Sequence, residues 1–147
     1  MKILFVCDGN TCRSPIAEFL LKDKLEKANI ASVEVASCGI NVLSNEQVSP
    51  LAAKALASKG INDCTHYAAV ITDDAVNNAD YIFTMSYRQK NIVSNYYKTQ
   101  KARCIGELTQ SEEIEDPYGK DYEAYKSVLN KLDVATDYIM NNIIRNN

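Results

Sequence analysis

Four short runs of β-forming residues lie between longer stretches of the chain that have a different pattern. The runs are residues 2–6, 33–36, 80–85 and 103–105. The first contains four apolar residues in succession, Ile3-Leu4-Phe5-Val6, which is typical of a buried strand. We predict a strand in each run.

The stretches between these runs have the spacing of helices. A helix is predicted after Pro15, and another over residues 51–59, which Pro50 opens and Gly60 ends. A third is predicted over residues 88–95. The last helix is the clearest, because one apolar stripe runs along it, formed by Tyr125, Val128, Leu129, Leu132, Ala135, Ile139 and Ile143.

Strands that alternate with helices indicate an α/β fold. We expect a single-domain doubly wound sheet of four parallel strands with helices on both faces. No linker, repeat or low-complexity tract divides the chain, so the domain is expected to span residues 1–147. In such sheets a ligand binds beyond the carboxyl ends of the strands, which is where the first strand reaches Cys7.

Composition and charge exclude several classes of function. The chain has 147 residues, and no apolar run approaches the roughly 18 residues of a membrane span. The net charge of −3 and the lack of a basic patch argue against a nucleic-acid partner. The first apolar run is too short for a signal peptide, and the five cysteines are an odd number, so free thiols in the cytoplasm are expected. With one histidine and no Cys/His cluster at zinc spacing, neither a metal nor a cofactor is expected.

Candidate chemistry follows directly after the first strand. Residues 7–15 read Cys-Asp-Gly-Asn-Thr-Cys-Arg-Ser-Pro, between a strand and a helix. A loop of this length can turn its backbone N–H groups toward one centre, where they and the Arg13 guanidinium bind a tetrahedral oxyanion. The same positive field is expected to hold Cys7 as a thiolate. The pattern therefore indicates phosphoryl transfer, with Cys7 as the nucleophile and Arg13 as a bidentate ligand of the phosphoryl oxygens.

The other loop positions suit the same chemistry. Gly9 allows close approach of the backbone or a positive φ, and Asn10 tolerates the left-handed conformation and can bond locally. The Ser14 hydroxyl can donate to the Cys7 thiolate. A cysteine after a buried strand can also be a small core residue, but these neighbours favour a nucleophile. The expected phosphate-binding residues are Asp8, Gly9, Asn10, Thr11, Cys12 and Ser14.

A thiolate nucleophile needs a proton donor for the leaving group, and Asp116 is the best candidate. It lies in Glu-Asp-Pro-Tyr, just before the last helix, and Pro117 favours an extended conformation at Asp116. Such a conformation suits a loop that projects a side chain over a cleft. Asp-Pro is also an ordinary turn sequence, so this assignment depends on its combination with the Cys7 motif.

These motifs together resemble the low-molecular-weight protein tyrosine phosphatase family over essentially the whole chain. The resemblance is carried by the N-terminal Cys-x5-Arg-Ser-Pro, by Ser37-Cys38-Gly39 after the second strand, and by Asp116-Pro117-Tyr118. It implies a phosphocysteine intermediate on Cys7, transition-state binding by Arg13, and Asp116 as acid and then base. It also implies that Asn10, Ser14, Ser37 and His66 support the loop, and that the partners are phosphorylated proteins.

Within that family the chain is most similar to the bacterial protein arginine phosphatases. Thr11 occupies a position where tyrosine-specific members usually carry Ile, and Tyr118 is followed by Gly119 rather than by a second aromatic residue. A small polar residue at position 11 can orient water or bond a guanidinium. Asp8 is unusual for either branch, and at the rim of the site it would attract a cationic guanidinium. Thr11, Asp8 and Tyr118 are therefore the expected specificity residues, with phosphoarginine favoured and phosphotyrosine as the alternative.

The cysteines suggest two further kinds of chemistry. Cys12 is predicted to form a reversible disulfide with Cys7 under peroxide, which protects the nucleophile. Arsenate reduction, known on the same fold, needs two further cysteines close together in sequence, whereas Cys64 and Cys104 are far apart. A non-catalytic phosphate-binding module is the remaining alternative, and the complete set of Cys7, Arg13 and Asp116 argues against it. The sequence does not indicate an oligomeric state.

Overall fold

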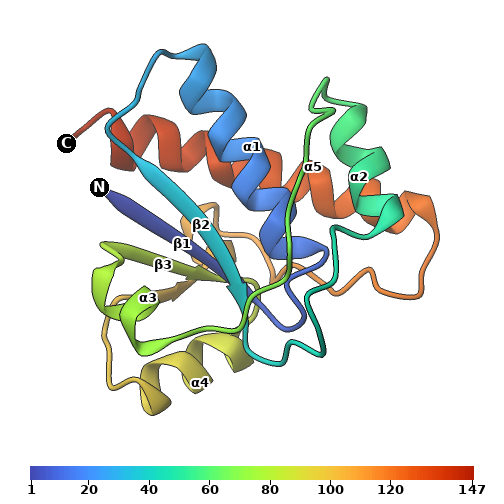
Figure 1. Ribbon diagram of the computed structural model, residues 1–147. Helices are drawn as coiled ribbons and strands as arrows, with labels where there is room; N and C mark the ends of the chain where they lie inside the picture. Colours follow the sequence, from blue (N-terminus) through green and yellow to red (C-terminus); the bar gives the residue numbers. More distant parts are fainter.

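The sheet is built around strand β1 (Lys2–Cys7), which has a parallel neighbour on each side. The computed structural model describes residues 1–147. β2 (Glu34–Gly39) pairs with one edge of β1 and β3 (Tyr81–Thr84) with the other, and β4 (Ala102–Cys104) extends the sheet beyond β3. All four strands are parallel, in the order β2-β1-β3-β4 (Figure 1).

The larger layer of helices lies on one face of this sheet. It consists of α1 (Arg13–Lys27), α2 (Pro50–Ala57) and α5 (Tyr122–Tyr138), which continues as a π-helical segment, η2 (Ile139–Ile144). Figure 1 shows α5 running behind α1 and reaching α2. None of the helices combines the length and the apolar character that a membrane span requires.

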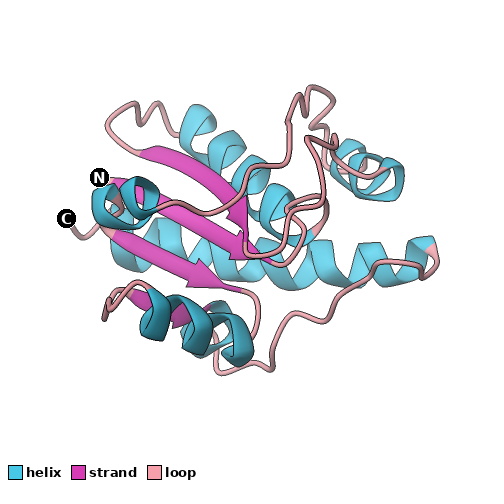
Figure 2. Ribbon diagram, turned by 60° about the horizontal axis from the view of Figure 1, so that its bottom comes forward, coloured by secondary structure: helices cyan, strands magenta, loops and turns pink.

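The opposite face carries two shorter helices, α3 (Asp73–Asn78) and α4 (Tyr87–Tyr96). Figure 2 shows the strands between these two helices and the larger helical layer. A short 3-10 helix, η1 (Ile105–Leu108), follows β4. The predicted doubly wound parallel sheet with helices on both faces is therefore confirmed.

Alternation along β1 explains why both faces are covered. Ile3 and Phe5 are fully buried in the core beneath α1 and α5, whereas Leu4 and Val6 point to the smaller core beneath α3 and α4. The strand therefore has no polar face, as its unbroken apolar sequence indicated. Every residue of the predicted apolar stripe in the last helix is likewise buried.

Several element boundaries differ from the prediction by a few residues, and one helix was not predicted. β2 extends through Gly39, so Ser37-Cys38-Gly39 lies within the strand and not after it. β4 ends at Cys104, because Ile105 already begins the 3-10 helix. Helix α3 was not predicted, since six residues are too few to show a helical period, although Thr72 caps its first turn by accepting the Ala75 N–H at 3.1 Å.

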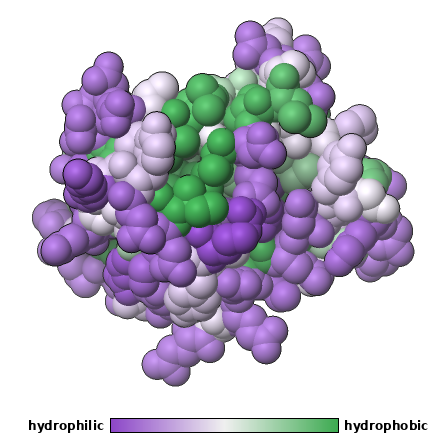
Figure 3. All heavy atoms as spheres, turned by 90° about the horizontal axis from the view of Figure 1, so that it is seen from below, coloured by the Kyte–Doolittle hydropathy of each residue, from purple (hydrophilic) through white to green (hydrophobic).

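The face that carries α3 and α4 leaves apolar side chains exposed. Figure 3, viewed from that side, shows a hydrophobic area surrounded by polar residues. A cavity of about 340 Å³ beside α4 is lined by apolar side chains, those of Ile40, Val70, Ile71, Ile92, Val93, Tyr96 and Tyr97. Two short helices thus cover this side of the sheet only in part.

Candidate active site

The Cys7 loop, residues 7–13, connects the end of β1 to the first turn of α1 and encloses a ring of free backbone donors. The N–H groups of Asp8, Gly9, Thr11 and Cys12 donate no hydrogen bond to the protein. The Asn10 N–H lies 3.3 Å from the Cys7 Sγ. Unpaired N–H groups in a tight loop at a helix N-terminus form an anion-binding site.

Two glycines shape the Cys7 loop in different ways. Gly39 of β2 lies beside the loop, and Gly9 lies within it. A Cβ atom on Gly39 would lie 2.5 Å from the Asp8 carbonyl oxygen, so the loop can rest against β2 only because Gly39 has no side chain. Gly9 has no positive φ, contrary to one of the two roles predicted for it. A Cβ on Gly9 would meet only the Thr11 Oγ1, at 3.9 Å, so Gly9 leaves space above the loop.

A cavity of about 340 Å³ opens over the loop. It is lined by every residue of the Cys7 loop together with Asn41, Leu43, Ser44, Glu46, Asp116 and Tyr118. The structure therefore brings Cys7, Arg13 and Asp116 to one cavity, as predicted, with Thr11 and Tyr118 at the same opening. Ser37 and His66 lie behind the loop and do not line the cavity.

Asn10 holds the loop from inside. Its side chain is fully buried, and its φ of +56° lies in the left-handed region, as predicted. The Nδ2 donates to the Ser14 Oγ at 2.8 Å and to the Ser37 Oγ at 2.9 Å. The Oδ1 accepts the Ala69 N–H at 3.0 Å. Both donor hydrogens and the acceptor oxygen of this amide therefore hold the loop closed.

A second set of polar residues supports the first from behind. Ser37 donates its hydroxyl hydrogen to the Glu18 Oε2 at 2.8 Å. The His66 Nε2 lies 2.9 Å from the Asn10 carbonyl oxygen, so it carries the proton and donates. The His66 Nδ1 lies 3.7 Å from Glu18. Ser37 and His66 thus contact the loop as predicted, and Glu18 joins them.

Cys7 lies at the bottom of the cavity with its sulfur buried. Its Sγ is 2.9 Å from the Ser14 Oγ. Burial raises the pKa of the Cys7 thiol, while the Ser14 hydroxyl, the Arg13 charge and the N–H groups of Ser14 and Asn10 act in the opposite direction. Burial is the largest of these influences, and the groups that oppose it include Ser14 and Arg13, the two that the sequence indicated would stabilise the thiolate.

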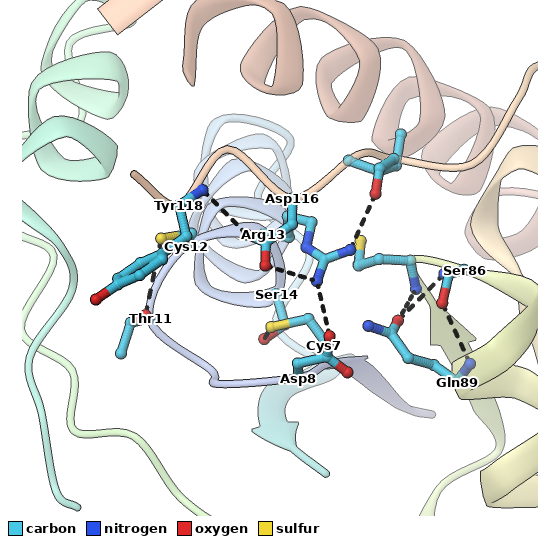
Figure 4. A network of polar contacts seen from close by, with 12 residues as sticks. Cys7, Asp8, Thr11, Cys12, Arg13, Ser14, Ser86, Gln89, Asp116 and Tyr118 are labelled. Atoms are coloured by element: carbon cyan, nitrogen blue, oxygen red, sulfur yellow. Dashed lines mark hydrogen bonds and ion pairs between the residues drawn. The ribbon is translucent and has the colours of Figure 1, made fainter. Parts of the chain in front are cut away.

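Arg13 is held by its outer nitrogens. The Nη1 donates to the Ile114 carbonyl oxygen at 3.0 Å. The Nη2 lies between two carboxylates, 3.5 Å from Asp8 and 3.7 Å from Asp116 (Figure 4). Because both carboxylate contacts are long, phosphoryl oxygens can replace them at the guanidinium.

Asp116 faces the cavity from the opposite side to the loop. Its Oδ1 accepts the Tyr118 N–H at 3.1 Å, which fixes the carboxyl group in a local turn. Half of its side chain, 52%, remains exposed. A carboxyl group with this fixed direction and access to solvent can exchange protons with a group bound above Cys7. Tyr118 is 77% exposed and forms part of the wall.

Asp8 does not point freely outward, as a rim residue was expected to. Its Oδ1 pairs with the Arg88 Nη2 of α4 at 2.5 Å, and its Oδ2 faces Arg13. Although burial acts to raise the pKa of Asp8, the Arg88 and Gln89 donors and the charges of Arg88 and Arg13 lower it. Asp8 is therefore a carboxylate at neutral pH, already paired with a guanidinium.

Cys12 lies at the other end of the loop, in contact with three hydroxyl groups. Its Sγ is 3.3 Å from the Ser49 Oγ, 3.6 Å from the Tyr125 OH and 3.7 Å from the Thr11 Oγ1. Burial and the contact with Cys12 raise the pKa of Tyr125 to about 12, so its hydroxyl stays protonated. All five cysteines are free, and only Cys7 and Cys12 line this cavity.

Sequence reasoning missed four residues around the Cys7 loop, three of which come from helices far along the chain. They are Glu18, Arg88, Gln89 and Tyr125. Glu18 carried one signal, because it is an acidic residue directly after the buried Ile16 and Ala17 of a helix. No sequence signal marked Arg88 as part of the site, since nothing in the sequence places it beside Asp8.

Comparison with known proteins agrees with this geometry. The family model described as low molecular weight phosphotyrosine protein phosphatase matches residues 2–147. A probable low molecular weight protein-tyrosine-phosphatase, EpsP from Ralstonia solanacearum, is 36% identical, covering 92% of this chain and 90% of that protein. The protein-arginine-phosphatase of Bacillus subtilis is 31% identical, with 90% of each chain covered. The structure of the YwlE arginine phosphatase from Geobacillus stearothermophilus superimposes with a TM-score of 0.90 at 27% identity, over 99% of this chain and 94% of that one.

Proposed function

Because the chain belongs to the low molecular weight phosphotyrosine protein phosphatase family, we propose that it removes phosphate from protein side chains through a phosphocysteine on Cys7. Phosphoarginine is the proposed preferred substrate. The protein is a phosphatase, and members of its family act on phosphorylated proteins. What is proposed is the role of each residue and the identity of the phosphorylated side chain.

In the first step the Cys7 thiolate attacks the phosphorus atom. A P–S bond forms as the bond from phosphorus to the leaving nitrogen or oxygen breaks. The free N–H groups of the Cys7 loop and the Arg13 guanidinium bind the three equatorial oxygens. Asp116 gives its proton to the leaving group, which departs as a neutral phenol or as the guanidinium of arginine.

In the second step water attacks the phosphocysteine from the side that the leaving group has vacated. Asp116, now a carboxylate, takes one proton from the water as the P–S bond breaks. Inorganic phosphate leaves, and the Cys7 thiolate is restored. The Ser14 hydroxyl, 2.9 Å from the Cys7 Sγ, stabilises the thiolate at the start and at the end of the cycle.

One observation carries this proposal. The Cys7 sulfur lies at the centre of a loop whose N–H groups have no other partner, with Arg13 beside it and Asp116 facing it across one cavity. A nucleophile, an oxyanion site and a proton donor are the three requirements of two-step phosphoryl transfer. A decayed binding module has no need for the third.

Three features support phosphoarginine as the substrate. Thr11 places a small polar side chain at the cavity, where a bulkier aliphatic residue would narrow it. Asp8 already binds one guanidinium, that of Arg88, so the rim offers a carboxylate to a second. Relatives named as protein-arginine phosphatases are among the most similar proteins by sequence and by structure.

Phosphotyrosine is the second candidate. Tyr118 stands exposed at the cavity wall, where its ring can stack on an aromatic substrate. The relative from Ralstonia solanacearum, at 36% identity, is named a probable tyrosine phosphatase. Arsenate reduction has weaker support, because Cys64 lines a different cavity with His66 and no third cysteine joins Cys7 and Cys12.

The substrate is tested by side-by-side turnover of a phosphoarginine and a phosphotyrosine peptide. We expect wild-type protein to favour phosphoarginine, and Thr11→Ile to reduce that preference about tenfold or more by blocking the space beside the loop. Asp8→Thr is expected to reduce the preference as well. Unchanged ratios in both variants would remove Thr11 and Asp8 as selectors, and a wild-type preference for phosphotyrosine would favour the alternative.

We also propose that the site responds to oxidation. Cys7 and Cys12 belong to the same loop and the same cavity, so a disulfide between them can form within the loop. Five free cysteines suit a reducing compartment such as the cytoplasm.

A further inference from the structure

Asp8 creates an electrostatic problem in the Cys7 loop. It is a carboxylate in a loop whose remaining groups are arranged to bind a dianion, and its Oδ2 lies 3.5 Å from the Arg13 Nη2. A negative charge beside the phosphoryl group repels it and also competes for Arg13. Only 34% of the Asp8 side chain is exposed, so solvent screens this charge in part only.

Helix α4 directs two donors at this carboxylate. The Arg88 Nη2 contacts the Asp8 Oδ1 at 2.5 Å, a full ångström closer than the contact between Asp8 and Arg13. Gln89, the next residue, is completely buried. Its Oε1 accepts the N–H groups of Met85 and Ser86 at 2.8 and 3.1 Å, which fixes the side chain.

The other end of the Gln89 amide faces Asp8 closely enough to lower the pKa of its carboxyl group, but it does not reach hydrogen-bond distance. Its Nε2 is the only buried side-chain nitrogen or oxygen in the molecule without a hydrogen bond. Figure 4 shows that this nitrogen is directed toward Asp8. A buried unpaired donor is costly, so one that is held in place beside a carboxylate indicates a function.

We propose that Arg88 and Gln89 are positioning residues that neutralise Asp8 and draw it away from Arg13 when the loop binds a phosphoryl group. Phosphoryl oxygens then replace Asp8 at the Arg13 Nη2. Asp8 keeps its short contact with Arg88 and gains the Gln89 Nε2 as a second donor. The inference rests on the proposed function only in taking the Cys7 loop as the phosphate site.

This arrangement has a quantitative consequence. Without Arg88, the charge of Asp8 is left facing the bound anion, so phosphate binds more weakly. When position 8 carries a neutral side chain, the loss of Arg88 leaves no negative charge facing the bound anion. The effects of the two substitutions are therefore coupled, as they are for two groups that act through each other.

The test is a double-mutant cycle with inorganic phosphate as the probe. Phosphate is titrated at low ionic strength into the wild type, Arg88→Gln, Asp8→Asn and the double variant, and the backbone amide signals of residues 8–13 are followed by NMR. We expect Arg88→Gln to raise the phosphate Kd about tenfold. In the Asp8→Asn background, the same change should alter Kd by less than about twofold.

Arg103→Gln is the matched control. Arg103 lies on β4, pairs with Glu107 at 3.6 Å, and is exposed, so its removal changes the net charge equally without touching the site. The phosphate Kd of Arg103→Gln should stay within about twofold of the wild-type value. Thermal unfolding of all variants separates a loss of stability from the coupling in Kd, which a merely structural role of Arg88 would not produce.

Two results would overturn the inference. An equal rise in Kd in both backgrounds means that Arg88 binds the anion directly, and an unchanged Kd in Arg88→Gln means that Asp8 needs no neutralisation. The cycle does not depend on turnover. Coupled Kd values in a protein that hydrolyses no phosphopeptide would support the inference and reject the proposed function. Additive effects on Kd in an active phosphatase would reject the inference and support the proposed function.

Discussion

The Sγ atom of Cys7 lies 2.9 Å from the Oγ atom of Ser14, and both atoms are buried. Burial raises the pKa of the Cys7 thiol, and the Ser14 hydroxyl is the largest influence in the opposite direction. The Ser14 hydroxyl is therefore the strongest single influence that favours the thiolate, which is the form in which Cys7 reacts.

Ser14→Ala is expected to shift the alkylation of Cys7 by iodoacetamide to higher pH. Because the thiolate is the reacting form, its rate rises as pH passes upward through the pKa. Removing a group that lowers this pKa moves the midpoint of the profile upward. Ser37→Ala is the control, since Ser37 contacts Asn10 but not Cys7. An unshifted profile in Ser14→Ala contradicts the role of its hydroxyl.

Asn10→Ala should lower both the free energy of unfolding and kcat. The substitution removes three hydrogen bonds made by the buried amide, to Ser14, Ser37 and Ala69. Their loss is expected to cost about 2–4 kcal/mol.

Asn29→Ala provides a matched control for Asn10→Ala. Asn29 has the same φ of 56° but is exposed, so it reports the cost of alanine in the left-handed region alone. Chemical denaturation measures both variants. If the two lose equal stability, the network around Asn10 does not hold the loop.

Cys12→Ser is expected to make oxidative inactivation irreversible. In wild type, peroxide converts Cys7 to a sulfenic acid, and the Cys12 thiol condenses with it, releasing water and forming a disulfide that dithiothreitol reduces. Without Cys12 the sulfenic acid is oxidised further. Intact mass and recovered activity are the measurements.

Cys64→Ser is the comparison for Cys12→Ser, because Cys64 lines a separate cavity and should not change recovery. Full rescue of oxidised Cys12→Ser by dithiothreitol would falsify the protective disulfide.

Local sequence predicted the parts of the site that lie close together along the chain. The Cys7 loop is one continuous segment, and its residue types determine both its anion chemistry and the left-handed φ at Asn10. The parallel sheet followed from the alternation of strand and helix patterns. Only β1 has the unbroken apolar run of a strand that is covered on both faces. Asp116 could be assigned as the proton donor only in combination with the Cys7 motif, since Asp-Pro alone is typical of many turns.

The remaining parts depend on tertiary contacts that no local pattern encodes. Arg88 reaches Asp8 only because α4 follows β3, the strand beside β1. Likewise, Tyr125 belonged to a helical stripe that predicted packing, and its hydroxyl meets Cys12 only because α5 lies against α1. The burial of Cys7, which acts against the thiolate, is likewise a property of the folded molecule that local sequence does not give.

The most direct test of the account is a rapid-quench measurement on Asp116→Asn with p-nitrophenyl phosphate. This substrate has a leaving group that needs no proton, so the first step proceeds, whereas activation of water in the second step is impaired. Intact mass and peptide mapping should then show one phosphoryl group on Cys7, and none in a protein that also carries Cys7→Ala. Turnover by Asp116→Asn at the wild-type rate, or a phosphoryl group on any residue other than Cys7, would contradict the account.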